Sequence, residues 1–538
     1  MLIVGAGPVG LTLALDLGRR GVRTILIEKR ERVLRLPKME RSNPRTMEIY
    51  RRLGMADKIR AAAYPPDGSM DVLILRSMRQ APLVHQVYPS VSQARRSIAD
   101  CVDGSVPREP YQLVSQYTLE GLLLAELATC KSLHLRLGME LIDLTQHDDR
   151  VDLRLRSVGR SATSTLSSRY VVGCDGANST VRELIGVKLR GASGLGAIAN
   201  IFFRCDELLR ESRVPRARHY LFAGVDSHGG AAGSMVVQDD QRHFATHLPA
   251  DLADSADLPG EIRRRCGLDI HPEILFTGRW VQNMMISDRH SHGRVYLAGD
   301  ANHVFIPAGG LGMNTGIVDA TNIAWKLAAV VTGWGGPQLL ASYGTERNAV
   351  AQRNLKAVGY AVEGVVAWRK IPLPVPGADA AANSRADAAY AAQVEPLNRR
   401  VYEMHGTDLG YRYASPVIWP QKGEPPADES YRYRPTTWPG AHLPHVWLPQ
   451  GEALYDRLSS GYHVLRVGCA AAKTDALEAA LRRRAVPFDV HTISDAAIRD
   501  VYECDLLLVR PDLHVAWRGN SLPTDPDAVV AAVTGHLS

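Results

Sequence analysis

Three short glycine-containing segments carry residues that could bind a nucleotide cofactor. The first is Gly5-Ala6-Gly7-Pro8-Val9-Gly10, which follows a β-prone run at residues 1–4 and precedes apolar residues up to Gly21. Glycines at this spacing permit a tight turn, close approach of the backbone to a pyrophosphate, and close packing of helix on strand. Residues 22–27 predict a second parallel strand, which ends at Glu28. A carboxylate there can accept hydrogen bonds from an adenosine ribose and would repel a 2′-phosphate, so this segment predicts FAD or NAD rather than NADP.

The second and third segments repeat the pattern of a strand followed by a turn. Residues 170–182 place the turn Cys174-Asp175-Gly176 after a strand, and Ser179 suits a helix N-cap. A structural turn and a cofactor contact remain equally open for it. Residues 294–300 form a further apolar strand ending in Gly299-Asp300, followed by a glycine-rich loop over 307–316 and an amphipathic helix over about 317–331. This loop would let a flat ring system lie against the backbone; the alternative is a flexible loop before a core helix.

Length and composition exclude several classes of protein. The chain has 538 residues, 45% of them hydrophobic and 22% charged, which suits a folded chain with more than one core and excludes a small binding module or a disordered chain. The net charge of +6 is spread along the chain without interleaved aromatic residues, so we expect no nucleic-acid partner.

Seven cysteines without a C-x-x-C pair suggest neither a disulfide framework nor a structural zinc site; we expect no metal and a cytoplasmic location. No run of 18 apolar residues is present, so we expect no membrane span. Because the first strand begins at Met1, the natural start could lie several residues upstream.

Taken together, the three segments resemble the class A flavoprotein monooxygenases of the para-hydroxybenzoate and phenol hydroxylase type. Their order and separation match that family over about the first 350 residues. The tail resembles the thioredoxin-like C-terminal domain of phenol hydroxylases and of polyketide and indolocarbazole hydroxylases. The resemblance implies an α/β fold: a Rossmann-like FAD-binding domain with an inserted antiparallel substrate sheet and a C-terminal thioredoxin-like domain.

The same resemblance divides the chain into parts. The FAD-binding domain takes 1–71, 99–185 and 281–345, the substrate sheet takes 72–98 and 186–280, and a helical segment (346–400), a linker (401–440) and the thioredoxin-like domain (441–538) follow. The last domain lacks C-x-x-C, so we expect it to serve structure or packing between subunits of a homodimer, not dithiol chemistry.

By this resemblance, most of the cofactor-binding residues lie in the three segments. Gly5, Gly7 and Gly10 are expected at the FAD pyrophosphate, Glu28 at the adenosine ribose, Asp300 at the ribityl and pyrophosphate region, and Pro307, Gly312, Met313 and Asn314 at the isoalloxazine ring, with Gln116 and Asp175 also reaching the cofactor. Pro8, Val9, Lys29, Lys38, Gly299 and Gly310 complete the expected set. Many members carry an Arg beside the flavin where this chain has Lys38, and an ammonium group cannot stack on a ring as a guanidinium does.

The expected activity follows from the cofactor. Side chains cannot hydroxylate an aromatic ring with O₂, so NADPH or NADH would reduce FAD, and a flavin C4a-hydroperoxide would pass one oxygen to a phenolic or polycyclic aromatic substrate. Two alternatives remain: a Baeyer–Villiger-type or decarboxylating oxygenase of the same fold, and a non-catalytic flavin-binding protein that traps a pathway intermediate. No catalytic base is assigned. His303 is the obvious candidate, although a histidine after a buried strand is more often structural, and Tyr220, Arg204, Arg279 and His247 fall in the expected substrate sheet.

Overall fold

The three glycine-containing segments follow three adjacent parallel strands of one sheet. The computed structural model describes residues 1–32, 39–160, 162–224, 233–255, 257–468 and 473–537. Strands β2 (Thr24–Glu28), β1 (Leu2–Val4), β11 (Val171–Gly173) and β20 (Val295–Leu297) lie side by side in parallel, with β7 (Leu133–Leu137) and β19 (Ser291–His292) at the edges. These strands are short and apolar, as expected for a sheet covered on both faces. Because the carboxyl ends of parallel strands meet at one edge, the sheet brings the three segments together, as the sequence predicted.

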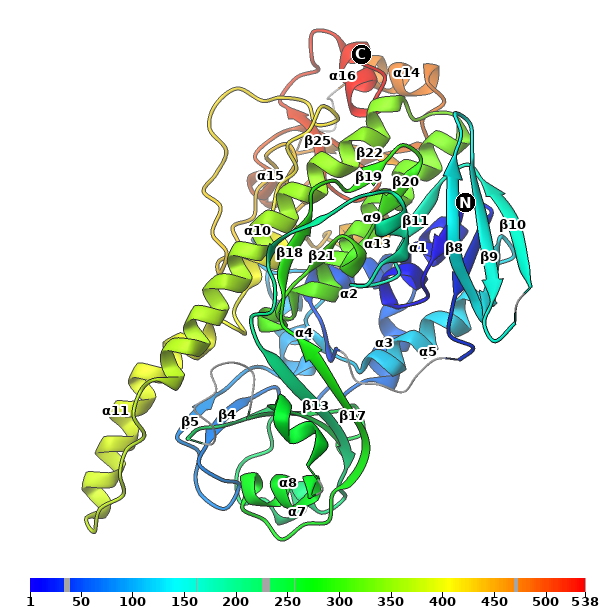
Figure 1. Cartoon of the computed structure of the whole chain (residues 1–538). Helices are drawn as coiled ribbons and strands as arrows, with labels where there is room; N and C mark the ends of the chain where they lie inside the picture. The colour runs from blue at the N-terminus through cyan, green and yellow to red at the C-terminus, as the bar shows by residue number, and fades with distance from the viewer. Residues whose placement is uncertain (33–38, 161, 225–232, 256, 469–472, 538) are drawn as a thin grey trace.

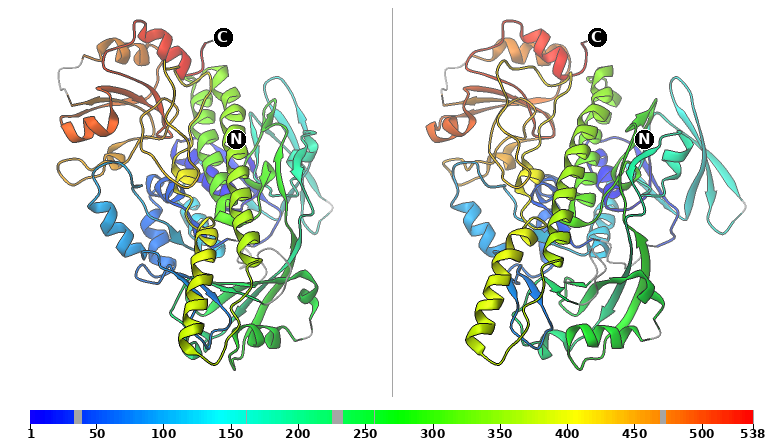
Figure 2. Two further views of the ribbon diagram at one scale, coloured as in Figure 1. Left: turned by 90° about the vertical axis from the view of Figure 1, so that its left-hand side faces the viewer. Right: turned by 60° about the vertical axis from the view of Figure 1, so that its left-hand side comes forward.

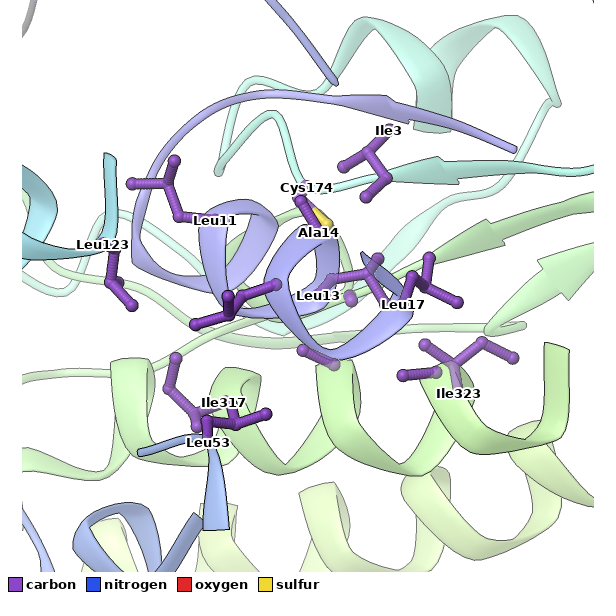
Figure 3. Packing of buried hydrophobic residues seen from close by; sticks show 14 of the residues in the cluster. Ile3, Leu11, Leu13, Ala14, Leu17, Leu53, Leu123, Cys174, Ile317 and Ile323 are labelled. Carbon is purple, nitrogen blue, oxygen red and sulfur yellow. The ribbon is translucent and has the colours of Figure 1, made fainter. Parts of the chain in front are cut away.

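Helix α1 (Pro8–Arg19) packs between this sheet and helix α9 (Leu311–Thr332). Leu13 and Leu17 of α1 meet Ile317 and Ile323 of α9 in the main core cluster, with α5 (Gln116–Leu127) alongside (Figure 3). A Cβ atom on Gly10 would lie 1.9 Å from the carbonyl oxygen of Gly5, so the close approach of helix and turn requires glycine.

Helix α9 begins at Leu311, earlier than the predicted start near residue 317. Gly312, Met313 and Asn314 therefore belong to its first turn and not to a loop. Packing overrides the low helix propensity of glycine here: a Cβ atom on Gly316 would lie 2.9 Å from Cα of Gly299.

The second large sheet lies below the first in Figure 1 and has the strand order β17-β13-β16-β15-β14-β4-β5. Its strands are β4 (Val72–Leu75), β5 (Val84–Gln86), β13 (Ala197–Arg204), β14 (His219–Phe222), β15 (Ser234–Val237), β16 (His243–Pro249) and β17 (Glu273–Val281). Every pair is antiparallel, as predicted, except β14 with β4, which pair in parallel and make the sheet mixed. A parallel pair needs a long connection, and the chain between β4 and β14 supplies one.

The two faces of this sheet differ in character. Tyr220 and Met235 point to the face covered by α7 (Leu208–Glu211) and α8 (Leu258–Cys266), where they join an apolar cluster. His219 and His247 lie on the opposite face, because side chains alternate along a strand and paired residues share a face.

Two long helices run along the molecule. Helix α10 (Pro337–Arg369) extends from the C-terminal domain toward the second sheet, and α11 (Ala380–Arg399) folds back along its end (Figure 2). The predicted proline-containing interruption at 371–377 lies between them.

The C-terminal domain is a four-stranded sheet of order β23-β22-β24-β25. Its elements are β22 (Tyr462–Val467), α14 (Asp475–Arg483), β23 (Phe488–Ile493), α15 (Ala496–Tyr502), β24 (Leu506–Val509), β25 (Val515–Gly519) and α16 (Pro526–Val533). Strand β22 pairs in parallel with β23 and antiparallel with β24, which gives the βαβαββα order expected of a thioredoxin-like domain.

Shorter elements complete the fold. They are β3 (Arg41–Ser42), β6 (Gln112–Leu113), β8 (Met139–Gln146), β9 (Val151–Ser157), β10 (Thr163–Ser168), β12 (Leu189–Ala192), β18 (Met284–Ser287), β21 (His303–Val304), α2 (Pro44–Arg52), α3 (Ala56–Ala62), α4 (Val91–Ala99), α6 (Thr180–Leu184), α12 (His405–Leu409), α13 (Leu454–Arg457) and the 3-10 helices Ala250–Asp254, Gly299–Ala301 and Ala308–Gly310. In the described part of the chain, no helix combines the length and apolar character that crossing a membrane requires.

Candidate functional site

A cavity of about 480 Å³ lies where the three segments meet. It draws lining residues from the ends of β1, β2 and β11, from the turn after β20 and from the start of α9. Of the residues expected to bind the cofactor, those that line it are Gly5, Gly7, Pro8, Val9, Glu28, Lys29, Gln116, Asp175, Asp300, Pro307, Gly310, Gly312 and Met313. Residues that the sequence places up to about 300 positions apart thus share one cavity.

The other expected residues lie elsewhere. Gly10, Gly299 and Asn314 stand behind the lining: the Gly299 amide donates to Asp319 (3.0 Å), and the Asn314 side-chain amide donates to the carbonyl oxygens of Arg41 (3.1 Å) and Gly310 (2.6 Å). They shape the wall through packing and hydrogen bonds. Lys38 lies outside the described residues.

One end of the cavity suits a pyrophosphate. Helix α1 has Gly7 as its N-cap, with no side-chain cap and no acidic residue in its first turn, so its first amide groups can donate to an anion. Beside it, the Glu28 carboxylate accepts hydrogen bonds from the Ala6 amide (2.8 Å) and from Arg30 Nε (2.8 Å). Burial alone would raise the pKa of Glu28, but these hydrogen bonds outweigh it and lower the pKa. Arg30 is a neighbour that sequence reasoning missed, two positions beyond the predicted residue.

The turn after β11 is held mainly by its own side chains. Ser179 caps α6, as predicted, by accepting from the Arg182 amide (3.0 Å). The Asp175 carboxylate accepts from the Ser179 hydroxyl and from the Val181 amide, and burial raises its pKa. Arg182 donates to the carbonyl oxygens of Ala177 (2.8 Å) and Ala301 (3.0 Å), which links the second segment to the third.

His303 occupies a structural position. Its side chain is fully buried, and its Nε2 lies 2.7 Å from Asp319, which also accepts from Arg347 Nε (2.6 Å). Its ring stacks on Phe305, with 4.9 Å between centroids, and Phe305 lines the cavity. The histidine therefore supports the wall and does not itself line the cavity.

A polar cluster lies at the side of the cavity that faces the second sheet. Glu40 and Arg41 line the cavity, and the half-buried Glu40 carboxylate lies 3.6 Å from Nε2 of His219. The Nδ1 atom of His219 lies 2.9 Å from the hydroxyl of Tyr402. The Arg41 guanidinium lies over the rings of Tyr402 (5.9 Å) and Tyr111 (5.6 Å).

Charges in this cluster are set by burial and by neighbouring groups. Burial lowers the pKa of His219 to about 4, so its imidazole is neutral at pH 7. Burial acts to raise the pKa of Glu40, but the nearby His219 and Arg41 outweigh it and lower the pKa. Nε2 of His219 has no hydrogen-bond partner among the described residues. An anionic carboxylate beside a neutral imidazole can stabilise a proton taken up by that ring.

Sequence reasoning missed Glu40, Arg41, His219 and Tyr402. The signal for His219 was its alternation with the apolar Tyr220, which fixes the two on opposite faces of β14. Among the four sheet residues named above, Tyr220 belongs to the apolar cluster on the far face, while Arg204 and Arg279 are exposed and pair with Asp206 and Asp254. His247 lies on the same face as His219. Its pKa is lowered, because burial outweighs the opposite effect of Glu40.

Comparison with known proteins agrees with this architecture. Residues 1–358 match the family model "FAD binding domain", and residues 436–537 match "Aromatic-ring hydroxylase, C-terminal". Aklavinone 12-hydroxylase DnrF of Streptomyces peucetius is 32% identical over 84% of this chain and 87% of its own length. The 2,4-dichlorophenol 6-monooxygenase of Cupriavidus pinatubonensis is 30% identical over 98% of this chain and 94% of its own length.

Solved structures show the same similarity over the whole chain. The rebeccamycin biosynthetic enzyme RebC with reduced flavin superposes with a TM-score of 0.86 at 30% identity, covering 100% of this chain and 99% of its own. Aklavinone-11 hydroxylase in complex with FAD and aklavinone superposes with a TM-score of 0.81 at 27% identity, covering 99% and 98%. The chain therefore belongs to the FAD-dependent aromatic-ring hydroxylases and is a flavin monooxygenase.

Proposed function

We propose that the cavity is the FAD site of this monooxygenase. The uncapped start of α1 fits the pyrophosphate, Glu28 fits the ribose, and Gly312 and Met313 in the first turn of α9 fit the isoalloxazine ring. Gly7 and Gly312 support this fit, because a Cβ atom on either would meet no described protein atom within 4 Å, so a ligand can approach the backbone there. When bound, FAD supplies the electron transfer from NADPH or NADH and the activation of O₂ that side chains cannot provide.

The substrate is a phenolic or polycyclic aromatic compound that lies between this cavity and the His219 face of the second sheet. The aromatic and cationic groups of Tyr111, Tyr402 and Arg41 suit a flat, electron-rich ring. Similarity to enzymes named for dichlorophenol and aklavinone supports the same substrate class.

His219 is the residue that takes the proton from the substrate hydroxyl. Its Nε2 faces the Glu40 carboxylate, its ring is neutral at pH 7, and the Tyr402 hydroxyl 2.9 Å from Nδ1 fixes its orientation. Glu40 then stabilises the imidazolium across 3.6 Å. Removing the proton makes the aromatic ring more nucleophilic, which favours attack on an electrophilic oxygen. The single observation behind this proposal is the neutral imidazole of His219, whose Nε2 lies 3.6 Å from the carboxylate of Glu40, a residue that lines the cavity. We further propose a cytoplasmic enzyme, with a homodimer as the assembly to test.

The experiment compares the holoprotein with its His219→Gln variant. With a panel of phenols and polycyclic aromatics, the wild type should consume NADPH or NADH and yield a product heavier by one oxygen, measured by mass spectrometry. The variant should keep its flavin absorbance but form product at least about 100-fold more slowly, because it lacks the base. Its NAD(P)H consumption should instead yield hydrogen peroxide.

His271→Gln is the matched control, because His271 is exposed and pairs with Glu207 at the far end of the second sheet. Equal product formation by His219→Gln and wild type would refute the role of His219. Purified protein that binds no FAD would refute the FAD site itself.

A further inference from the structure

A second cluster of ligating side chains lies in the C-terminal domain, apart from the FAD cavity. It consists of His463 on β22 and of Asp489 and His491 on β23, and one ligand atom from each lies within 4.8 Å of the others. The two strands pair in parallel, with His463 opposite Asp489 and Leu465 opposite His491. Paired residues share a face, and so do residues two apart on a strand, so this register places all three side chains on one face of the sheet.

His463 is arranged as a metal ligand. Its side chain is fully buried, and its Nε2 donates to the carbonyl oxygen of Ser459 (3.2 Å), which fixes the tautomer and leaves the Nδ1 lone pair free. Nδ1 lies 3.9 Å from Asp489 Oδ2 and has no hydrogen-bond partner among the described residues. A backbone carbonyl on the other ring nitrogen is the usual support of a metal-bound histidine.

His491 shows the same lack of a partner. Its Nε2 is buried and makes no hydrogen bond within the described chain, and the two histidine rings lie 5.5 Å apart between centroids. Two partnerless imidazole nitrogens beside a carboxylate are costly without a ligand, because buried polar atoms are normally satisfied.

We propose that His463, Asp489 and His491 bind a divalent transition-metal ion of the Zn²⁺ class. Two imidazoles and one carboxylate suit zinc better than Ca²⁺ or Mg²⁺, which prefer all-oxygen sites. Asp489 is about half-exposed, so an ion can enter from solvent, and water can complete the coordination. This proposal departs from the expectation of no metal drawn from the sequence. That expectation rested on cysteine spacing, whereas these histidines come together only through the pairing of β22 with β23.

Such an ion would clamp the edge of the C-terminal sheet near the FAD-binding domain. Arg52 of α2 donates to the same Ser459 carbonyl (2.9 Å) and to the Pro511 carbonyl (2.7 Å). The charge of Arg52 acts on His463 and that of Arg457 acts on His491, and Arg457 pairs with Glu452 (2.7 Å). Their positive charge and the single carboxylate ligand limit the affinity, so we expect micromolar binding.

The test uses tag-free holoprotein, because a histidine tag would itself bind zinc. After dialysis against a chelator, Zn²⁺ is titrated by calorimetry and bound metal is counted by elemental mass spectrometry. We expect one saturable site per chain and a higher unfolding temperature with Zn²⁺, since a ligand of the folded state stabilises it. Co²⁺ should give visible bands beyond the flavin absorption.

The variants are His491→Gln and Asp489→Asn, because these positions are partly exposed, whereas replacing the buried His463 risks misfolding. Each should weaken Zn²⁺ binding by at least about tenfold and reduce the Zn²⁺-dependent stabilisation accordingly. His536→Gln, also in this domain, should bind as wild type does. Flavin content and circular dichroism establish that each variant is folded. No saturable binding to wild type, or equal affinity in His491→Gln, would overturn the proposal.

Discussion

Glu28 illustrates how one carboxylate can organise a binding turn before any ligand arrives. Its two oxygens accept from the Ala6 amide and from Arg30, so the turn after β1 is joined to the end of β2. An adenosine ribose at this position would share a carboxylate that is already ionised and held in place. Such preorganisation reduces the ordering cost of binding.

Replacing Glu28 by Gln should weaken FAD binding. The amide oxygen can still accept from Ala6, but the charge that strengthens the hydrogen bonds from Arg30 and the ribose is lost. We expect the Kd for FAD to rise about tenfold, which corresponds to roughly 1.4 kcal/mol. Fluorescence titration of FAD into deflavinated protein measures it, with the exposed Glu31→Gln as control. An unchanged Kd in Glu28→Gln would contradict the assigned role.

At the residue scale, the sequence identified the residues that lie within local strand–turn–helix units. Glycines at fixed spacing and the carboxylate at the next strand end depend on local geometry alone, so they were readable. Glu40, His219 and Tyr402 were not, because they meet only through tertiary packing. Their approach depends on the parallel pairing of β14 with β4 and on where the chain returns after α11.

At the element scale, α9 shows tertiary packing deciding where a helix begins. Gly312 and Gly316 disfavour a helix locally, and this is why the sequence placed a loop there. The helix nevertheless forms from Leu311, since Gly316 lets it approach Val9 and the backbone of Gly299. The proline-marked break between α10 and α11 was predicted correctly, because proline acts locally.

Gly316→Ala should therefore destabilise the protein although alanine is the better helix former. Its Cβ would lie 2.6 Å from Val9 Cγ2 and 2.9 Å from Cα of Gly299, and the backbone contact cannot relax easily. We expect the free energy of unfolding to fall by about 1–3 kcal/mol, measured by urea denaturation. Gly359→Ala in α10 is the matched control, because its Cβ would meet no described atom closer than 4.0 Å. Its free energy of unfolding should rise by up to about 1 kcal/mol, since alanine is the better helix former. Equal effects of the two substitutions would show that close packing at Gly316 is unimportant.

At the scale of the whole molecule, buried ion pairs join the C-terminal domain to the FAD-binding domain. Arg510, which follows β24, donates to both oxygens of Glu346 on α10 (2.7 and 3.0 Å) and also pairs with Asp512. Lys326 of α9 donates to the same Glu346 (2.7 Å). All four side chains are buried. This link could not be predicted from the sequence, because each charge viewed alone is typical of a solvated surface.

Arg510→Met should destabilise the docked domain strongly, because it leaves Glu346 and Asp512 without their shared cation. Removing one partner of a buried pair costs about 3–5 kcal/mol, measured here as the free energy of unfolding in urea at pH 7. Adding Glu346→Gln should restore part of that loss. The control Arg483→Met breaks the exposed pair with Asp527 and should change stability little. A small effect of Arg510→Met would mean that this buried ion-pair cluster contributes little to holding the domains together.

Acid should destabilise the whole molecule through its buried neutral histidines, of which His445 is the clearest. Burial lowers its pKa to about 3, and neither ring nitrogen has a hydrogen-bond partner among the described residues. Between about pH 3 and 6.5 the unfolded chain binds a proton at this residue that the folded chain does not, so stability falls as pH falls by roughly 1.4 kcal/mol per unit. His445→Leu removes this dependence without breaking a hydrogen bond. When the pH falls from 7 to 5, wild type should lose about 2 kcal/mol more of its free energy of unfolding than His445→Leu does, measured by urea denaturation. His134 is exposed, so His134→Leu is the control and should show no such difference. If the unfolding free energies of His445→Leu and wild type differ by the same amount at pH 7 and pH 5, the role of His445 is refuted.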